Sequence, residues 1–155
     1  MADHKAICRE ISIAIWNLTS RSTLYEKTIL NLLGINHSDL RALSELGRMG
    51  SMPAGQLADV LHITSGASTA LIDRLERKGF VRRSKDAADR RRIMVMMTEP
   101  GRQKTFNLTG PLVEKIQTQL ESYSPNDLQL IHGFLIKVND LFMERVTQLE
   151  EESPR

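Results

Sequence analysis

Residues 54–101 restrict the possible folds of this chain most strongly, because the hydrophobic pattern changes twice within them. Apolar residues keep a helical spacing from Leu57 until Thr64-Ser65-Gly66, where a second helical pattern begins. Gly79 is expected to end this second helix, since glycine tolerates the left-handed conformation that commonly closes a helix. The pattern then becomes extended, in two short segments at 80–83 and 93–97 joined by a polar turn. Two short helices followed by a β-hairpin predict a winged helix-turn-helix.

The second of these helices has an outer face that suits nucleic acid. Thr64 or Ser65 can cap it, because a side-chain oxygen there accepts a backbone N–H of the first turn. Its inward stripe is expected to be Ala67, Leu71 and Leu75, at four-residue spacing. Its outward face is then expected to carry Ser65, Ser68, Thr69, Asp73 and Arg77. Short hydrogen-bonding groups in the first turns are typical of a helix that lies in the major groove of DNA.

Positive charge is concentrated in and beside the hairpin. Residues 73–92 contain nine Lys or Arg against four acidic residues, a local net charge of +5. The whole chain carries only +2, so the other residues sum to 2 − 5 = −3. This segregation places positive charge where phosphates would lie.

The segment 89–101, with the sequence D-R-R-R-I-M-V-M-M-T-E-P-G, resembles the D-x-R-x5-L-T-x-x-G signature of the MarR family of bacterial transcription regulators. Met97 stands where the family usually has leucine. The segment 71–81 also resembles the end of the family's recognition helix, and the resemblance extends along nearly the whole chain. It implies that Asp89 braces the wing through a salt bridge to an arginine, with Arg74 as the candidate partner. It also implies that Arg91 reaches the minor groove.

We therefore predict a sequence-specific transcriptional regulator, a repressor, that binds double-stranded operator DNA. The predicted DNA-binding residues are Thr64, Ser65, Ser68, Thr69, Asp73, Arg74, Arg77, Lys85, Asp89, Arg90, Arg91 and Arg92. Two alternatives stay open: a winged-helix module that binds protein instead of DNA, and a small cytosolic enzyme built on a helical dimer. The sequence shows no Ser-His-Asp set, Gly-rich phosphate loop or metal-ligand set, so we expect no enzyme activity, metal or cofactor.

Long helices are predicted on both sides of the winged segment. They cover residues 5–33, 99 to about 123, and 125 onward, with caps at Thr98 and Ser124 and a kink or break near 108–111 at Gly110-Pro111. Ser38 is expected to cap the helix that follows the first. The apolar seam of the last helix is wider than one small lobe needs, which favours a homodimer on a near-palindromic site over a purely intrachain core.

The predicted fold class is mainly α with a small β-wing, a winged helix-turn-helix with N- and C-terminal helices that form a dimerisation lobe. The predicted division is 1–35 for the N-terminal helix of the dimer lobe, 36–101 for the DNA-binding domain, and 102–155 for the C-terminal helices. No run of about 18 apolar residues indicates a membrane span. The N-terminus lacks a signal-peptide pattern and the chain has one cysteine, so we expect a cytoplasmic protein.

The family resemblance also implies a small aromatic or phenolic effector, bound between the two lobes, that releases the DNA. The candidate lining residues are Trp16, Asp39, Arg41, Leu43 and Arg83. The single cysteine, Cys8, offers an alternative, because some members of the family sense oxidants through a cysteine in the first helix. Ordinary core packing for Trp16 and an inert thiol for Cys8 remain the simpler interpretations.

Overall fold

A computed structural model describes residues 3–86, 89 and 92–152. The elements are α1 (His4–Leu33), α2 (His37–Met49), β1 (Ser51–Pro53), α3 (Ala54–Leu61), α4 (Ser65–Arg77), β2 (Val81–Lys85), β3 (Ile93–Met97), α5 (Glu99–Leu120) and α6 (Pro125–Glu152). The predicted fold class, mainly helical with a small β-wing, is confirmed. The chain forms two compact units, Met1–Thr109 and Gly110–Arg155, whose boundary lies within α5.

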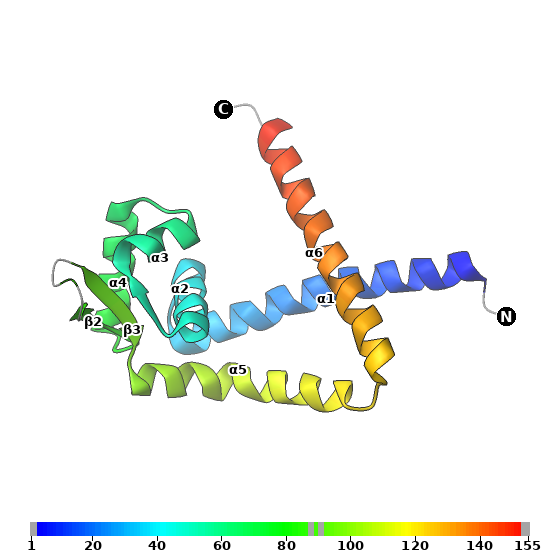
Figure 1. The fold of residues 1–155 in the computed structure, drawn as a ribbon, viewed down its shortest axis with the longest axis horizontal. Coiled ribbons are helices and arrows are strands. Elements are labelled where there is room, and N and C mark those ends of the chain that lie inside the picture. Colours follow the sequence, from blue (N-terminus) through cyan, green and yellow to red (C-terminus); the bar gives the residue numbers. More distant parts are fainter. Residues whose placement is uncertain (1–2, 87–88, 90–91, 153–155) are drawn as a thin grey trace. The chain divides into compact units, whose positions relative to one another are not determined.

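The core of the first unit lies where α2, α3 and α4 pack around the small sheet (Figure 1). Leucines from all three helices are almost fully buried there, and so are one phenylalanine after α4 and two valines of the sheet. These residues are Leu43, Leu46, Leu57, Leu71, Leu75, Phe80, Val81 and Val95. The C-terminal end of α1 adds Ile29 and Leu33 to the same core. This core fixes α4 and the wing relative to each other, because residues of both are part of it.

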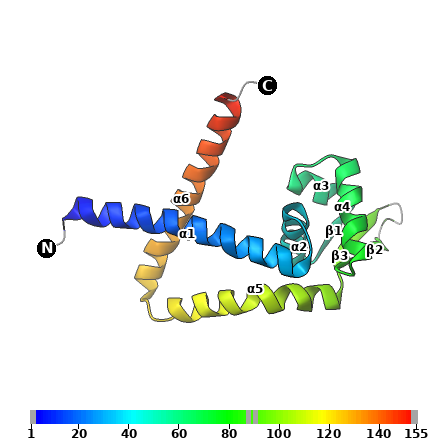
Figure 2. The same ribbon diagram turned by 180° about the vertical axis from the view of Figure 1, so that it is seen from behind.

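The sheet has three antiparallel strands in the order β1-β3-β2. The wing strands match the prediction, with Val81 opposite Met97 and Lys85 opposite Ile93. Strand β1, beside β3 in Figure 2, was not predicted. Its Met52 pairs with Val95. This strand has only three residues and ends in a proline, so it is too short for an alternation of polar and apolar residues to indicate it.

Side-chain caps define most of the helix starts. Thr64, one of the two predicted candidates, caps α4 and accepts a hydrogen bond from the Ala67 N–H at 3.2 Å. Ser124 accepts one from the Asp127 N–H at 3.2 Å, as predicted. The predicted cap at Ser38 is wrong. Asn36 caps α2 instead, because its side chain accepts from the Asp39 N–H while the Asp39 carboxylate accepts from the Asn36 N–H. This reciprocal pair satisfies two N–H groups that would otherwise lack partners.

The start of α5 is fastened to the turn between α4 and β2. The Thr98 hydroxyl donates to the Gly79 carbonyl at 2.6 Å and accepts from the Gly101 N–H at 3.0 Å, while the Thr98 N–H donates to the Phe80 carbonyl at 2.9 Å. Gly101 lies so close to Phe80 that a β-carbon added there would meet the Phe80 carbonyl oxygen at 2.4 Å. Thr98 therefore supplies the hydrogen bonds that join α5 to this turn, and Gly101 allows the close approach of the two backbones.

Helix α5 continues through Pro111, so a break near residues 108–111 is wrong, and the alternative of a kink there stays a prediction. In the second unit, none of the residues that the structure describes in α6 is buried. Several large apolar side chains of α6 are instead open to solvent, among them Leu130 at 73% and Leu141 at 63%. Within the described ranges, no helix combines the length and the apolar content that a membrane span requires.

Candidate nucleic-acid interface

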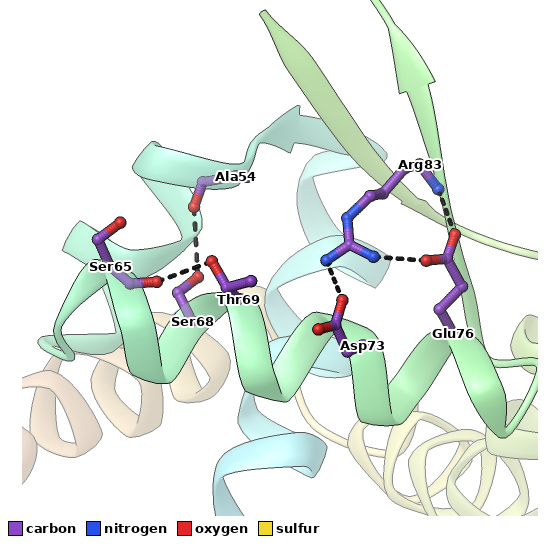
Figure 3. Close-up of polar contacts among 7 residues, drawn as sticks. All are labelled: Ala54, Ser65, Ser68, Thr69, Asp73, Glu76 and Arg83. Atoms are coloured by element: carbon purple, nitrogen blue, oxygen red, sulfur yellow. Dashed lines mark hydrogen bonds and ion pairs between the residues drawn. The ribbon is translucent and has the colours of Figure 1, made fainter.

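Helix α4 exposes its first turns at the surface. Thr64, Ser65 and Thr69 are exposed. The Thr69 hydroxyl donates to the Ser65 carbonyl at 3.0 Å (Figure 3), which leaves its methyl group and oxygen lone pairs for an external partner. A helix whose first turns are uncovered and lined by short side chains can approach base edges closely.

Ser68 does not belong to this exposed face, and its prediction as a DNA-contacting residue is wrong. Its side chain is 2% exposed, and its hydroxyl donates to the Ala54 carbonyl at 3.4 Å in Figure 3. The buried stripe of α4 is Ser68, Leu71, Ile72 and Leu75, and Ala67 is exposed. The helix is thus rotated from the predicted orientation, and a serine can occupy the buried position because its hydroxyl finds an acceptor on α3.

Arg74 binds Asp39, and its predicted pairing with Asp89 is wrong. Arg74 Nη2 lies 2.6 Å from Asp39 Oδ1, and Arg74 Nε lies 3.1 and 3.0 Å from the two carboxylate oxygens. The hydrogen bonds to Asp39 raise the pKa of Arg74 above its ordinary value. Asp39 is completely buried, so this ion pair joins α4 to the start of α2 inside the protein. Asp39 is therefore not accessible to DNA or to an effector, while the Arg74 side chain stays 33% exposed.

Arg83 binds two carboxylates of α4. Its Nη2 lies 2.5 Å from Asp73 Oδ1 and its Nη1 lies 2.5 Å from Glu76 Oε2, while its backbone N–H donates to Glu76 Oε1 at 3.1 Å (Figure 3). Partial burial lowers the pKa of Arg83, but the hydrogen bonds to Asp73 and Glu76 outweigh it and leave the pKa above its ordinary value. Asp73 and Arg83 are therefore partners of each other, which the sequence analysis did not foresee.

Other cations of the basic segment stay on the surface. Among the described residues, no ion-pair partner is found for the exposed side chains of Arg77, Lys78, Arg82, Lys85 and Arg92. The Asp89 carbonyl accepts from the Arg92 N–H at 2.9 Å. The predicted contacts Arg90 and Arg91 lie outside the described residues.

The five residues predicted to line an effector crevice do not gather at one place. Arg41 lines a groove of about 330 Å³ together with Tyr25, Leu40 and Thr109. Leu43, itself buried, borders a neighbouring groove of about 300 Å³ with Met97 and Arg102. Trp16 is 70% exposed on α1, and Asp39 and Arg83 form the ion pairs above. Tyr25 and Arg102 were missed, because no local pattern marks a groove between distant helices.

Cys8 is exposed on α1, with its Sγ 3.7 Å from Nε2 of His4. These two side chains lie one helical turn apart. An oxidant-sensing role for Cys8 remains a prediction.

The sequence is similar to known transcriptional regulators. Residues 35–93 match the model of the MarR family. An uncharacterized HTH-type transcriptional regulator of Bacillus subtilis, YcgE, is 32% identical over 134 residues, which cover 86% of this chain and 87% of that protein.

Two solved structures share the fold. A DNA complex of S. aureus MepR is 21% identical with a TM-score of 0.62 and covers 84% of this chain and 98% of that one. A complex of NadR with 4-hydroxyphenylacetate is 24% identical with a TM-score of 0.58 and covers 81% and 91%. These two structures support the fold alone. The match to the family model and the similarity to the regulator from Bacillus subtilis show that the chain belongs to the MarR family of transcriptional regulators.

Proposed function

We propose that this protein is a homodimeric repressor that reads a near-palindromic operator. The observation that carries the proposal is the position of α4 beside the wing, with the first turns of α4 uncovered and exposed cations on β2. In this arrangement Ser65 and Thr69 face base edges in the major groove, and Lys85 and Arg92 approach the phosphates. The wing-tip arginines Arg90 and Arg91 are proposed to reach the adjacent minor groove.

The exposed apolar residues support a dimer. Leu24 and Leu32 of α1 are 66% and 63% exposed, and α6 shows the same feature along its length. Large apolar surfaces of this kind mark an interface, since water does not solvate them favourably. A second copy of the chain would cover them, and its α4 would read the second half-site about one helical turn away. Residues 1–35 and 102–155 are the proposed dimer lobe.

A small aromatic or phenolic anion is the proposed effector. The groove that contains Arg102 combines apolar walls with one arginine, whereas Glu26 and Glu45 lie beside Arg41 in the neighbouring groove, so the Arg102 groove is the proposed site. An aromatic carboxylate needs this combination, because its ring prefers apolar contacts and its charge prefers a guanidinium. The structural neighbour NadR was solved with 4-hydroxyphenylacetate, a ligand of this class.

Selection of bound duplexes from a random pool tests the DNA-binding proposal. Recovery of an inverted repeat, together with a dimeric mass by light scattering, is the expected result. Recovery of no duplex at any salt concentration would favour a module that binds protein instead. A recovered sequence without twofold symmetry would contradict the proposed arrangement of two α4 helices.

Salt dependence tests the wing. The slope of log Kobs against log[salt] is negative, and its magnitude falls by about 0.9 for each phosphate contact that is removed. Arg91→Ala is expected to weaken binding and to flatten this slope. Unchanged affinity and slope would remove Arg91 from the interface.

A further inference from the structure

Arg83 connects the wing to α4 at the edge of the proposed DNA-binding surface. We propose that Arg83 is a positioning residue for DNA binding, which neutralises Asp73 on the DNA-facing side of α4 and holds β2 against α4, and does not itself contact phosphate. This inference rests on the proposed DNA-binding function. In this role Arg83 acts on DNA binding through Asp73, by cancelling its charge, and is not counted among the cations that attract phosphate.

Asp73 lies on the face of α4 that is proposed to meet DNA. Ser65, Thr69 and Asp73 follow one another at four-residue intervals, which places them on one side of a helix. The Asp73 side chain is 48% exposed, so its charge is open to the solvent and to a ligand on that side. An uncompensated carboxylate there would repel the phosphates of an approaching duplex.

The guanidinium of Arg83 is well placed to remove this repulsion. Val81 is buried, and Arg83 two residues later lies on the same side of β2, so the alternation of the strand directs Arg83 towards α4. Its two terminal nitrogens bind Asp73 and Glu76 separately, at 2.5 Å each (Figure 3). The planar fork of arginine allows both contacts at once.

The same geometry argues against a phosphate contact by Arg83. Its side chain is 29% exposed, and a phosphate would have to displace two carboxylates that already hold it. Arg82 and Lys85 of the same strand are exposed and have no ion pair with any residue that the structure describes. Lys85, which lies on the same side of β2 as Arg83, is therefore the better placed phosphate ligand on this strand.

The test measures the affinity for the selected duplex and for an unrelated duplex over a range of salt concentrations. Arg83→Gln is expected to weaken binding to both by about tenfold, because it leaves two carboxylates uncompensated. The double variant Asp73→Asn/Arg83→Gln has the formal charge of the parent and keeps Glu76 as the acceptor for the backbone N–H of residue 83. Its affinity is expected to return to within about threefold of the parent.

Asp73→Asn alone is expected to change the affinity for DNA in the opposite direction to Arg83→Gln, and it leaves the contacts between Arg83 and Glu76 in place. It is expected to bind equally well or up to about threefold more tightly, since it removes a negative charge from the DNA-facing side. Lys85→Gln is the matched control, because it removes an exposed cation from the same side of the same strand. It is expected to weaken binding and flatten the salt slope by about 0.9 per subunit, and Asp73→Asn is not expected to restore that slope.

Three results would overturn the role of Arg83. A double variant as weak as Arg83→Gln, with a flatter salt slope, would show that Arg83 contacts phosphate. Weaker binding by Asp73→Asn would show that Asp73 makes a favourable contact with DNA. An unsubstituted chain that binds no duplex would overturn the proposed function, and this role with it, and is distinguished from the other two because it appears before any substitution is made.

Discussion

Gly101→Ala is expected to destabilise the protein although it replaces a helical glycine with the best helix former. An added β-carbon would lie 2.4 Å from the Phe80 carbonyl oxygen, 2.7 Å from its Cα and 2.8 Å from its carbonyl carbon. All three atoms belong to the backbone, so no side-chain rotation relieves the contact. Helix α5 would have to move away from the α4–β2 turn and lengthen the 2.9 Å hydrogen bond from the Thr98 N–H to the Phe80 carbonyl.

The change in the free energy of unfolding follows from two destabilising contributions and one stabilising contribution. Overpacking costs about 1 to 3 kcal/mol, and a weakened hydrogen bond costs about 1 kcal/mol. The helix propensity of alanine returns about 1 kcal/mol. The net loss in the free energy of unfolding is therefore about 1 to 3 kcal/mol, measured by urea denaturation followed by circular dichroism at one fixed protein concentration.

Gly133→Ala in α6 is the matched control for this prediction. A β-carbon there meets none of the described residues of its own chain within 4 Å, so helix propensity is expected to stabilise the folded chain by up to about 1 kcal/mol. The two glycines thus predict opposite signs for the same chemical change. A Gly101→Ala protein that is as stable as the parent, or stabilised like the Gly133→Ala protein, would refute the close contact with Phe80.

Three further perturbations follow from the structure. Arg74→Ala leaves the buried Asp39 carboxylate without its cation and is expected to cost about 2 to 3 kcal/mol, more than Asp39→Asn, whose orphaned arginine is one-third exposed; thermal unfolding of both variants checks the order. Thr69→Ala is expected to change the base preference of the selected duplexes, whereas Ser68→Ala leaves it unchanged because its hydroxyl faces Ala54; repeating the selection with each variant distinguishes them. Phe134→Ser in α6 is expected to shift the mass in solution towards the monomer, although its side chain is already 43% exposed in one chain; light scattering at several concentrations detects the shift.

Features that depend on neighbouring residues were predictable from the sequence. Thr64, Thr98 and Ser124 were predicted as caps and form the expected hydrogen bonds, because a cap and its N–H partner lie within three residues. The cap of α2 was misplaced from Asn36 to Ser38, since several residues there can accept an N–H. The choice depends on where Asp39 must point, and that is decided by a residue far away in the chain.

The orientation of α4 shows why periodicity alone leaves a helix face uncertain. Ala67 and Ser68 are both small, and either can begin a stripe that continues to Leu71 and Leu75. The close approach of Ala54 on α3 selects Ser68, since the Ala54 carbonyl supplies the acceptor that its hydroxyl needs. Such a contact between two helices is a tertiary property that one helical pattern does not contain.

The charges of the basic segment show the same limit at the binding surface. The sequence count of nine cations against four acids is correct, yet it does not say which cations face outward. Arg74 turns inward to Asp39, which lies 35 residues earlier, and Arg83 turns to Asp73 and Glu76 on the adjacent helix. Both arginines hold α4 in place, one from the side of α2 and the other from the side of the wing. Attraction for phosphate must then come from the exposed cations that remain, so neutralising Arg83 together with Asp73 should leave the affinity for DNA nearly unchanged.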